Sequence, residues 1–236
     1  AVARRRLSGR DDYMVDDPVG AIARNVPVLG VILVGGASRR YGQDKAMARL
    51  GGMPMVQRVA AQVVGQVSML TASGTGRPGL NLPVIPDAVP HGGPLPALLS
   101  ILTWADENRL DLVATFSCDT PFLPAELVTR LRGALKPDRD CAVALHGGAA
   151  HPTCALWRTS ALAKIQAAFD AGTRSLHGAL GHLKACAADF SDLGEGPGGD
   201  PFFNINSQSE MAVAQAWIDH VSGREAVRTA SQEVFP

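Results

Sequence analysis

The spacing of apolar residues alternates between two patterns from Pro27 onward. Short runs of β-branched and other apolar residues, the first of them Val28–Val34, are typical of strands buried on both faces of a parallel sheet. Between these runs, apolar residues recur three and four positions apart, as on one face of a helix. Strands are expected at 28–34, 67–72, 82–86, 112–117, 141–145 and 185–190, with an apolar segment at 153–157; helices are expected around 56–67, 95–102, 124–135, 159–171 and 175–183.

This alternation predicts a single-domain α/β protein with a mostly parallel, open, Rossmann-like sheet flanked by helices and joined by right-handed crossovers. In such sheets, ligands bind beyond the carboxyl ends of the strands. Three polar motifs follow predicted strands: Gly35–Lys45, Asp87–Leu95 and Cys118–Pro124. The sequence therefore places a candidate site at that edge of the sheet.

The two ends of the chain lack the alternation. Residues 1–27 contain five Arg and four Asp without steady periodicity, and the Asp residues interrupt any apolar leader, so a disordered N-terminal extension is expected. The folded domain is expected over 28–222, followed by a C-terminal tail over 223–236. Ser207 with Glu210 forms a capping-box pattern, which predicts a last helix from Gln208 to about His220.

Composition argues against several kinds of partner. Lys plus Arg and Asp plus Glu both total 22, so no net charge attracts nucleic acid or an anionic membrane surface. No apolar run approaches the roughly 20 residues of a membrane-spanning helix. Cys118, Cys141, Cys154 and Cys186 have neither a CxxC pair nor zinc-type spacing, and we expect reduced core thiols in a cytoplasmic protein.

The loop after the first predicted strand has the composition of an anion-binding loop. It reads GG-x-S-x-R-x-G-x-D-K from Gly35 to Lys45, and it matches neither the Walker loop nor the GxGxxG fingerprint. Gly35 and Gly36 allow backbone N–H groups to approach an anion closely, and Arg40 and Lys45 add positive charge. The pattern favours a polyphosphate ligand; the alternative is a glycine-rich turn whose charged side chains point into water.

Two carboxylates follow later strands. Asp119 comes directly after a buried strand and is suited to hold Mg²⁺ against nucleotide phosphates, since Mg²⁺ usually takes one or two carboxylates plus phosphate oxygens. The alternative role for Asp119 is to cap the following helix. Asp87 is suited equally to a nucleotide contact and to shaping the Asp-Ala-Val-Pro turn.

The first loop resembles the signature LAGGxSxRMGxDK of the molybdenum cofactor guanylyltransferases, within the wider nucleotidyltransferases of the nucleotide-diphospho-sugar-transferase fold. Residues 33–45 read LVGGASRRYGQDK and depart from that signature at Val34 and Tyr41. The segments IPDAVPHGGPLPALL, CDTPFLP, HPTCALW and FFNINSQSE resemble later family elements, so the resemblance covers about Val28 to Ile218. One departure concerns the base: the family often has Asn near the guanine at the end of the second strand, where this chain reads LTASG.

The resemblance implies transfer of GMP from GTP to the terminal phosphate of molybdopterin, with Mg²⁺ as cofactor. It implies Lys45, Arg40 and Asp119 as catalytic residues, with Asp119 as metal ligand. The implied nucleotide-binding residues are Leu33, Val34, Gly35, Gly36, Ser38, Arg40, Lys45, Asp87, Gly93, Pro94, Leu95 and Asp119, and the implied molybdopterin-binding residues are Asn204, Asn206 and His151. Other cofactor-biosynthesis proteins and apo-molybdoenzymes are implied as further partners.

Some alternatives stay open from the residues. Asn204 and Asn206 alternate along one predicted strand, which suits pterin edges or phosphates, but the pair also suits a cap and turn before the last helix. His151, before a proline, is suited to a cofactor contact, to a general base or to a structural role. A cytidylyltransferase and a non-catalytic cofactor carrier are the rival functions; Gly35 and Gly93-Pro94-Leu95 favour guanine over cytosine in the family, and intact Arg40, Lys45 and Asp119 argue against a carrier.

Overall fold

The computed structural model describes residues 26–34, 45–74, 80–89 and 92–232, with the backbone alone for 224–232. Its centre is a seven-stranded sheet in the order β5-β4-β1-β6-β8-β7-β9. β8 runs antiparallel to β6 and β7, and all other neighbouring strands in this sheet are parallel, which confirms the mostly parallel prediction. The strands are β1 (Val28–Leu33), β4 (Met69–Ser73), β5 (Val84–Ile85), β6 (Leu112–Ser117), β7 (Cys141–His146), β8 (Ala149–Arg158) and β9 (Ala185–Asp189).

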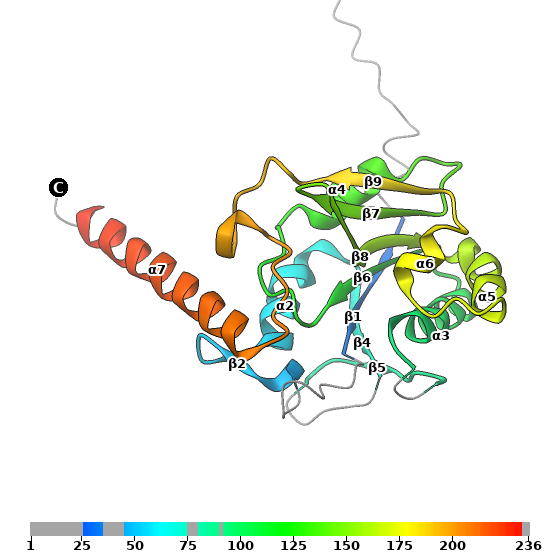
Figure 1. Ribbon diagram of the computed structural model, residues 1–236, viewed down its shortest axis with the longest axis horizontal. Helices are drawn as coiled ribbons and strands as arrows, with labels where there is room; N and C mark the ends of the chain where they lie inside the picture. Colours follow the sequence, from blue (N-terminus) through cyan, green and yellow to red (C-terminus); the bar gives the residue numbers. More distant parts are fainter. Residues whose placement is uncertain (1–25, 35–44, 75–79, 90–91, 233–236) are drawn as a thin grey trace, which may run out of the picture.

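Helices cover both faces of the sheet (Figure 1). α2 (Met55–Val63) and α4 (Leu127–Ala134) pack on one face, where Val59 and Leu131 join Ile32 and Phe116 in one apolar cluster. α3 (Pro94–Glu107), α5 (Leu162–Asp170) and the short α6 (Leu176–Leu180) cover the other face against β1 and β6. The two clusters make a three-layered core whose central layer is the sheet.

A third, smaller cluster joins the C-terminal part of the chain to the core. α7 (Gln208–Gln232) begins beside a two-stranded hairpin of β2 (Arg49–Leu50) and β3 (Met53–Pro54), and its far end extends away from the sheet (Figure 1). Trp217 of α7 meets the ring of Phe122 edge-on at 4.8 Å between centroids, and Ile205 is fully buried beside them. This packing holds the segment before α7 against the loop that follows β6.

Several sequence predictions need correction. α7 was expected to end near His220 but continues to Gln232, because residues 224–232 are mostly good helix formers and contain neither Gly nor Pro. Residues 203–206 form no strand. α4 begins at Leu127 instead of Pro124, since a turn closed by the Leu127 N–H on the Pro124 carbonyl precedes it. The β2–β3 hairpin and the reversal of β8 were not predicted.

The order of the strands locates a crevice. The chain passes from β1 to β4 and β5 on one side, then crosses to β6 on the other side of β1. This change of direction makes the carboxyl ends of β1 and β6 the switch point of the sheet, where ligands bind in folds of this kind. None of the helices within the described ranges is long and apolar enough to span a membrane.

Candidate active site at the carboxyl ends of β1 and β6

Lys45 and Asp119 meet at this switch point. Lys45 opens a short 3₁₀ helix, η1 (Lys45–Met47), and Asp119 lies two residues beyond the end of β6. The Lys45 ammonium donates to Asp119 Oδ2 at 2.6 Å, and the two side chains are only 13% and 16% exposed. Because little water surrounds the pair, its charges act on a nearby anion or cation with little screening.

The carboxylate of Asp119 is held from two sides. The hydroxyl of Ser117, the last residue of β6, donates to Asp119 Oδ1, while Lys45 contacts Oδ2. The Thr120 hydroxyl donates to the Ser117 carbonyl at 3.1 Å, which ties the turn after β6 to the strand end. Ser117 was not among the predicted site residues, although residues two apart along an extended strand end share a side of the chain.

Asn206 completes the cluster from the distant C-terminal segment. Lys45 donates to Asn206 Oδ1 at 2.7 Å, so one ammonium bridges an amide oxygen and a carboxylate oxygen. The Ile205 N–H donates to the Asp119 carbonyl at 3.0 Å, and the buried Ile205 side chain anchors the segment. Exposed Asn204 and Asn206 flank Ile205, so the predicted alternation is present without the predicted strand.

The start of α7 fixes Asn206. The Ser207 hydroxyl accepts the Glu210 N–H at 3.2 Å, as the capping-box pattern predicted, and Glu210 Oε2 accepts the Asn206 N–H at 2.7 Å. The Ser207 hydroxyl also donates to Glu210 Oε2 at 2.8 Å. This bond and then the one from the Asn206 N–H hold the pKa of Glu210 below its ordinary value, and the charge of Lys45 contributes in the same direction. Glu210 therefore stays ionised beside the Lys45 cluster and positions Asn206.

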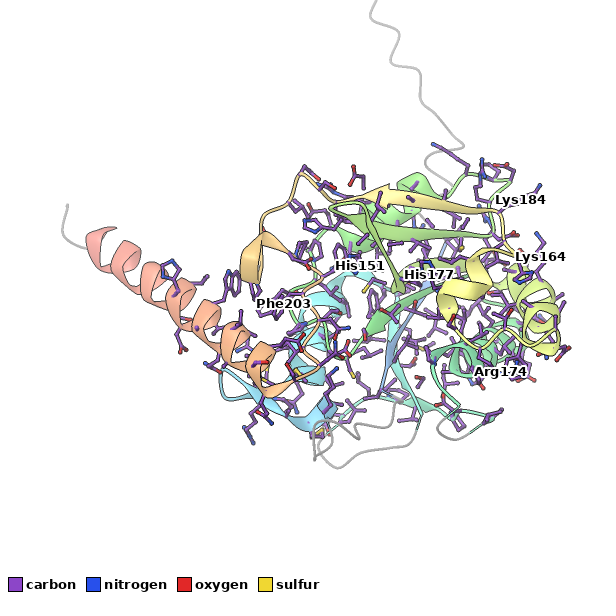
Figure 2. The ribbon with its side chains drawn as sticks, in the orientation of Figure 1. His151, Lys164, Arg174, His177, Lys184 and Phe203 are labelled. Carbon is purple, nitrogen blue, oxygen red and sulfur yellow. The ribbon has the colours of Figure 1, made fainter. Side chains whose placement is uncertain are left out.

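His151 belongs to a neighbouring group. Its ring, on β8, stacks on Phe202 at 4.6 Å between centroids, and burial lowers the pKa of its imidazole. In Figure 2, Phe203 lies on the loop before α7, and His151 lies nearer the middle of the sheet. His151 is thus connected to the Asn204–Asn206 segment through Phe202, and a neutral imidazole is the favoured form.

The remaining predicted residues divide into two groups. Leu33 is the last residue of β1, Val34 follows it, and both are buried. Asp87 is half-buried and follows β5. The start of α3 is formed by Gly93, which has a φ of 90°, Pro94 and Leu95. These residues lie at the carboxyl end of β1 or in the chain that follows the carboxyl end of β5. Gly35, Gly36, Ser38 and Arg40 lie outside the described residues.

Comparison with known proteins agrees with this geometry. Residues 30–185 match the MobA-like NTP transferase domain, a span that contains both Lys45 and Asp119. The chain belongs to this family. Asn206 lies beyond the matched span, so the family match and the Lys45–Asn206 contact are separate observations.

Relatives of this MobA-like protein match over most of their length. A molybdenum cofactor guanylyltransferase of Cereibacter sphaeroides is 38% identical over 194 residues, which are 80% of this chain and 96% of the relative. One from Rhodobacter capsulatus is 35% identical over 193 residues, again 80% of this chain and 95% of the relative. The crystal structure of molybdopterin-guanine dinucleotide biosynthesis protein A from Archaeoglobus fulgidus superposes with a TM-score of 0.65 at 20% identity, covering 81% of this chain and 99% of that one.

The family membership makes this chain a nucleotidyltransferase by descent. The fold agrees with the family match, because the Archaeoglobus fulgidus structure has the same arrangement of sheet and helices at only 20% sequence identity. The Lys45–Asp119–Asn206 cluster is where the described residues concentrate charge and hydrogen-bonding groups at the switch point.

Proposed function

We propose that this protein transfers GMP from GTP to the terminal phosphate of molybdopterin, giving molybdopterin guanine dinucleotide and pyrophosphate. The proposal rests on the match of this chain to 96% of the length of a relative named molybdenum cofactor guanylyltransferase. It is supported by the contacts of Lys45 with Asp119 and Asn206 at the switch point. A second relative in this family, at 35% identity, bears the same name.

The oxygens around Lys45 fit a magnesium ion. The ammonium lies 2.6 Å from Asp119 Oδ2 and 2.7 Å from Asn206 Oδ1, so a single cation can reach both oxygens. Carboxylate and amide oxygens suit Mg²⁺, which takes its other ligands from phosphates and water. We propose Asp119 and Asn206 as its ligands; when bound with the nucleotide, the ion would neutralise charge on the triphosphate.

The proposed reaction needs alignment more than covalent help. A phosphate oxygen of molybdopterin attacks the α-phosphorus of GTP, the bond from that phosphorus to the bridging oxygen breaks, and pyrophosphate leaves with the bond electrons. Lys45 moves from Asp119 to the triphosphate and stabilises the charge that develops on its oxygens. Arg40, which precedes Lys45 in the same loop, is proposed to act on the same phosphates.

We propose that two further residues, Ser117 and Glu210, hold the metal ligands in place. Ser117 holds Asp119 Oδ1 and Glu210 holds the Asn206 backbone, so both oxygens proposed for the metal keep their positions. We also propose that His151 and Asn204 contact molybdopterin. The ring of His151 stacks on Phe202, and Asn204 is exposed two residues before Asn206.

Pyrophosphate release tests the transferase activity. The protein with molybdopterin and Mg²⁺ is expected to release pyrophosphate with GTP faster than with CTP, ATP or UTP. Faster release with CTP would instead support the rival cytidylyltransferase. Absence of pyrophosphate with every nucleotide, while molybdopterin still binds, would support a cofactor carrier and contradict the proposal.

A further inference from the structure

The third apolar cluster of the core contains a residue from each segment that supplies the candidate active site. Each of these residues is buried and lies close along the chain to one site residue: Leu50 after Lys45, Phe122 after Asp119, and Ile205 directly before Asn206. α7 completes the cluster with the buried Ala214 and the partly buried Trp217. A shift in this packing would therefore move the side chains of the site, because close-packed interiors transmit small displacements.

Trp217 lies where α7 meets the loop after β6. Its ring meets Phe122 edge-on, with 4.8 Å between the centroids and 72° between the ring planes. Two residues earlier on α7, which begins beside β2 (Figure 1), Gln215 Oε1 accepts the Gly51 N–H at 2.7 Å. The same helix therefore holds both the hairpin that follows Lys45 and the loop that contains Phe122.

The packing around Trp217 matters most when Lys45 is engaged with a ligand. In the free protein, the Lys45 ammonium bridges Asp119 and Asn206 at 2.6 and 2.7 Å. Both bonds are given up when the ammonium moves to the triphosphate. The bond from the Ile205 N–H to the Asp119 carbonyl then remains, together with the apolar cluster around Trp217. The spacing of the two oxygens proposed for Mg²⁺ therefore comes to depend on this packing.

We propose that Trp217 is a positioning residue for the nucleotidyl transfer, an inference that rests on the proposed function. Its ring, packed on Phe122, keeps Asn206 beside Asp119 while Lys45 stabilises the triphosphate. Trp217 acts through these neighbours and not on the substrates. A tryptophan with a structural role alone would contribute to stability, and its loss would leave the response of the enzyme to Mg²⁺ unchanged.

Replacement of Trp217 by leucine tests this role, because leucine keeps an apolar contact and removes the ring that meets Phe122. Pyrophosphate release is measured with molybdopterin, GTP and varied Mg²⁺. The half-saturating Mg²⁺ concentration is expected to rise about tenfold and kcat to fall about tenfold. The KM for GTP is expected to stay within about twofold of the wild type, since Gln215 still holds the hairpin after Lys45. Trp217→Phe keeps an aromatic ring and is expected to restore the wild-type values.

Trp104→Leu is the matched control, because Trp104 is also partly buried and packs against the apolar cluster on the α3 face of the sheet. It is expected to lower the melting temperature without changing kcat or the Mg²⁺ dependence. Phe122→Leu removes the other ring of the pair and is expected to reproduce the effects of Trp217→Leu. The double variant is expected to match the slower of the two single variants, because both changes break one contact.

Hydrogen exchange of residues 203–206 in the presence of GTP gives a second readout that needs no turnover. Exchange is expected to be about tenfold faster in Trp217→Leu than in the wild type and unchanged in Trp104→Leu. Wild-type kcat and Mg²⁺ dependence in Trp217→Leu, or unchanged exchange, would overturn the role of Trp217, and so would a Trp217→Phe variant as slow as Trp217→Leu. If Trp217→Leu does not fold, the same outcomes in Phe122→Leu decide. Wild-type protein that releases no pyrophosphate would contradict the proposed transfer, and the exchange measurement would still test the packing.

Discussion

Replacement of Asp119 by asparagine is expected to reduce pyrophosphate release by at least about a hundredfold. The change keeps the size of the side chain and its ability to accept from Ser117, but it removes the negative charge that faces Lys45 at 2.6 Å. With that charge goes the main ligand proposed for Mg²⁺, so raising the Mg²⁺ concentration is expected to restore only part of the rate. Initial rates across a magnesium titration measure both effects.

Asp140→Asn is a close control, because Asp140 forms a second lysine–aspartate pair outside the site. Its carboxylate, 11% exposed, accepts from Lys164 at 2.7 and 2.8 Å. Burial raises the pKa of Asp140, but the bonds from Lys164 and the Lys184 N–H outweigh it and lower the pKa. The stability that Asp140 contributes is therefore present above its unfolded-state pKa and lost as pH falls through the lowered folded-state value. We expect Asp140→Asn to be less stable than the wild type at neutral pH and to release pyrophosphate at the wild-type rate. Wild-type activity in Asp119→Asn would contradict the proposal that Asp119 is a metal ligand.

Replacement of Lys45 by methionine is expected to raise the KM for GTP by about 10- to 100-fold, because a charged hydrogen bond to the triphosphate is lost. Methionine keeps most of the length of the side chain without the ammonium. The same variant is expected to bind Mn²⁺ at least as tightly as the wild type when nucleotide is absent, since the ammonium no longer occupies Asp119 and Asn206. Steady-state kinetics and Mn²⁺ titration measure the two effects.

Lys164→Met removes the lysine of the Asp140 pair and is expected to leave the KM for GTP unchanged. A KM in Lys45→Met equal to that of the wild type would mean that Lys45 has no contact with the triphosphate. Weaker Mn²⁺ binding in Lys45→Met would contradict the view that its ammonium and a divalent cation share the oxygens of Asp119 and Asn206.

The central elements of the fold were predictable because their signals are local. The β-branched runs marked β1 and β6, and the Leu112–Ser117 strand agrees residue for residue. The reversal of β8 also had a local signal: Gly147 and Gly148, at φ 55° and 80°, connect His146 to Ala149 in a two-residue hairpin. Two adjacent glycines after an apolar run therefore indicated antiparallel pairing that the alternation alone did not.

The site was predictable only in part, because its contacts join distant segments. Motif spacing identified Lys45 and Asp119, but their 2.6 Å contact depends on the adjacency of β1 and β6, which the sequence does not state. The Lys45–Asn206 bond spans 161 residues and depends on Ile205 being buried against the loop after β6. Residues 204–206 alternate between exposed and buried positions as a strand does, but they pair with no strand in the described parts of the chain. The sequence pattern alone could not distinguish an extended loop from a strand here.

The identity of the product tests the proposed function most directly. The protein is incubated with molybdopterin, Mg²⁺ and equal concentrations of GTP and CTP. The dinucleotide products are then separated, identified and quantified by mass spectrometry. We expect molybdopterin guanine dinucleotide to predominate with the wild-type protein, and we expect Asp119→Asn to form almost none of it. A product mixture in which molybdopterin cytosine dinucleotide predominates would contradict the proposed function. So would the absence of any dinucleotide when folded wild-type protein is incubated with intact molybdopterin and nucleotides.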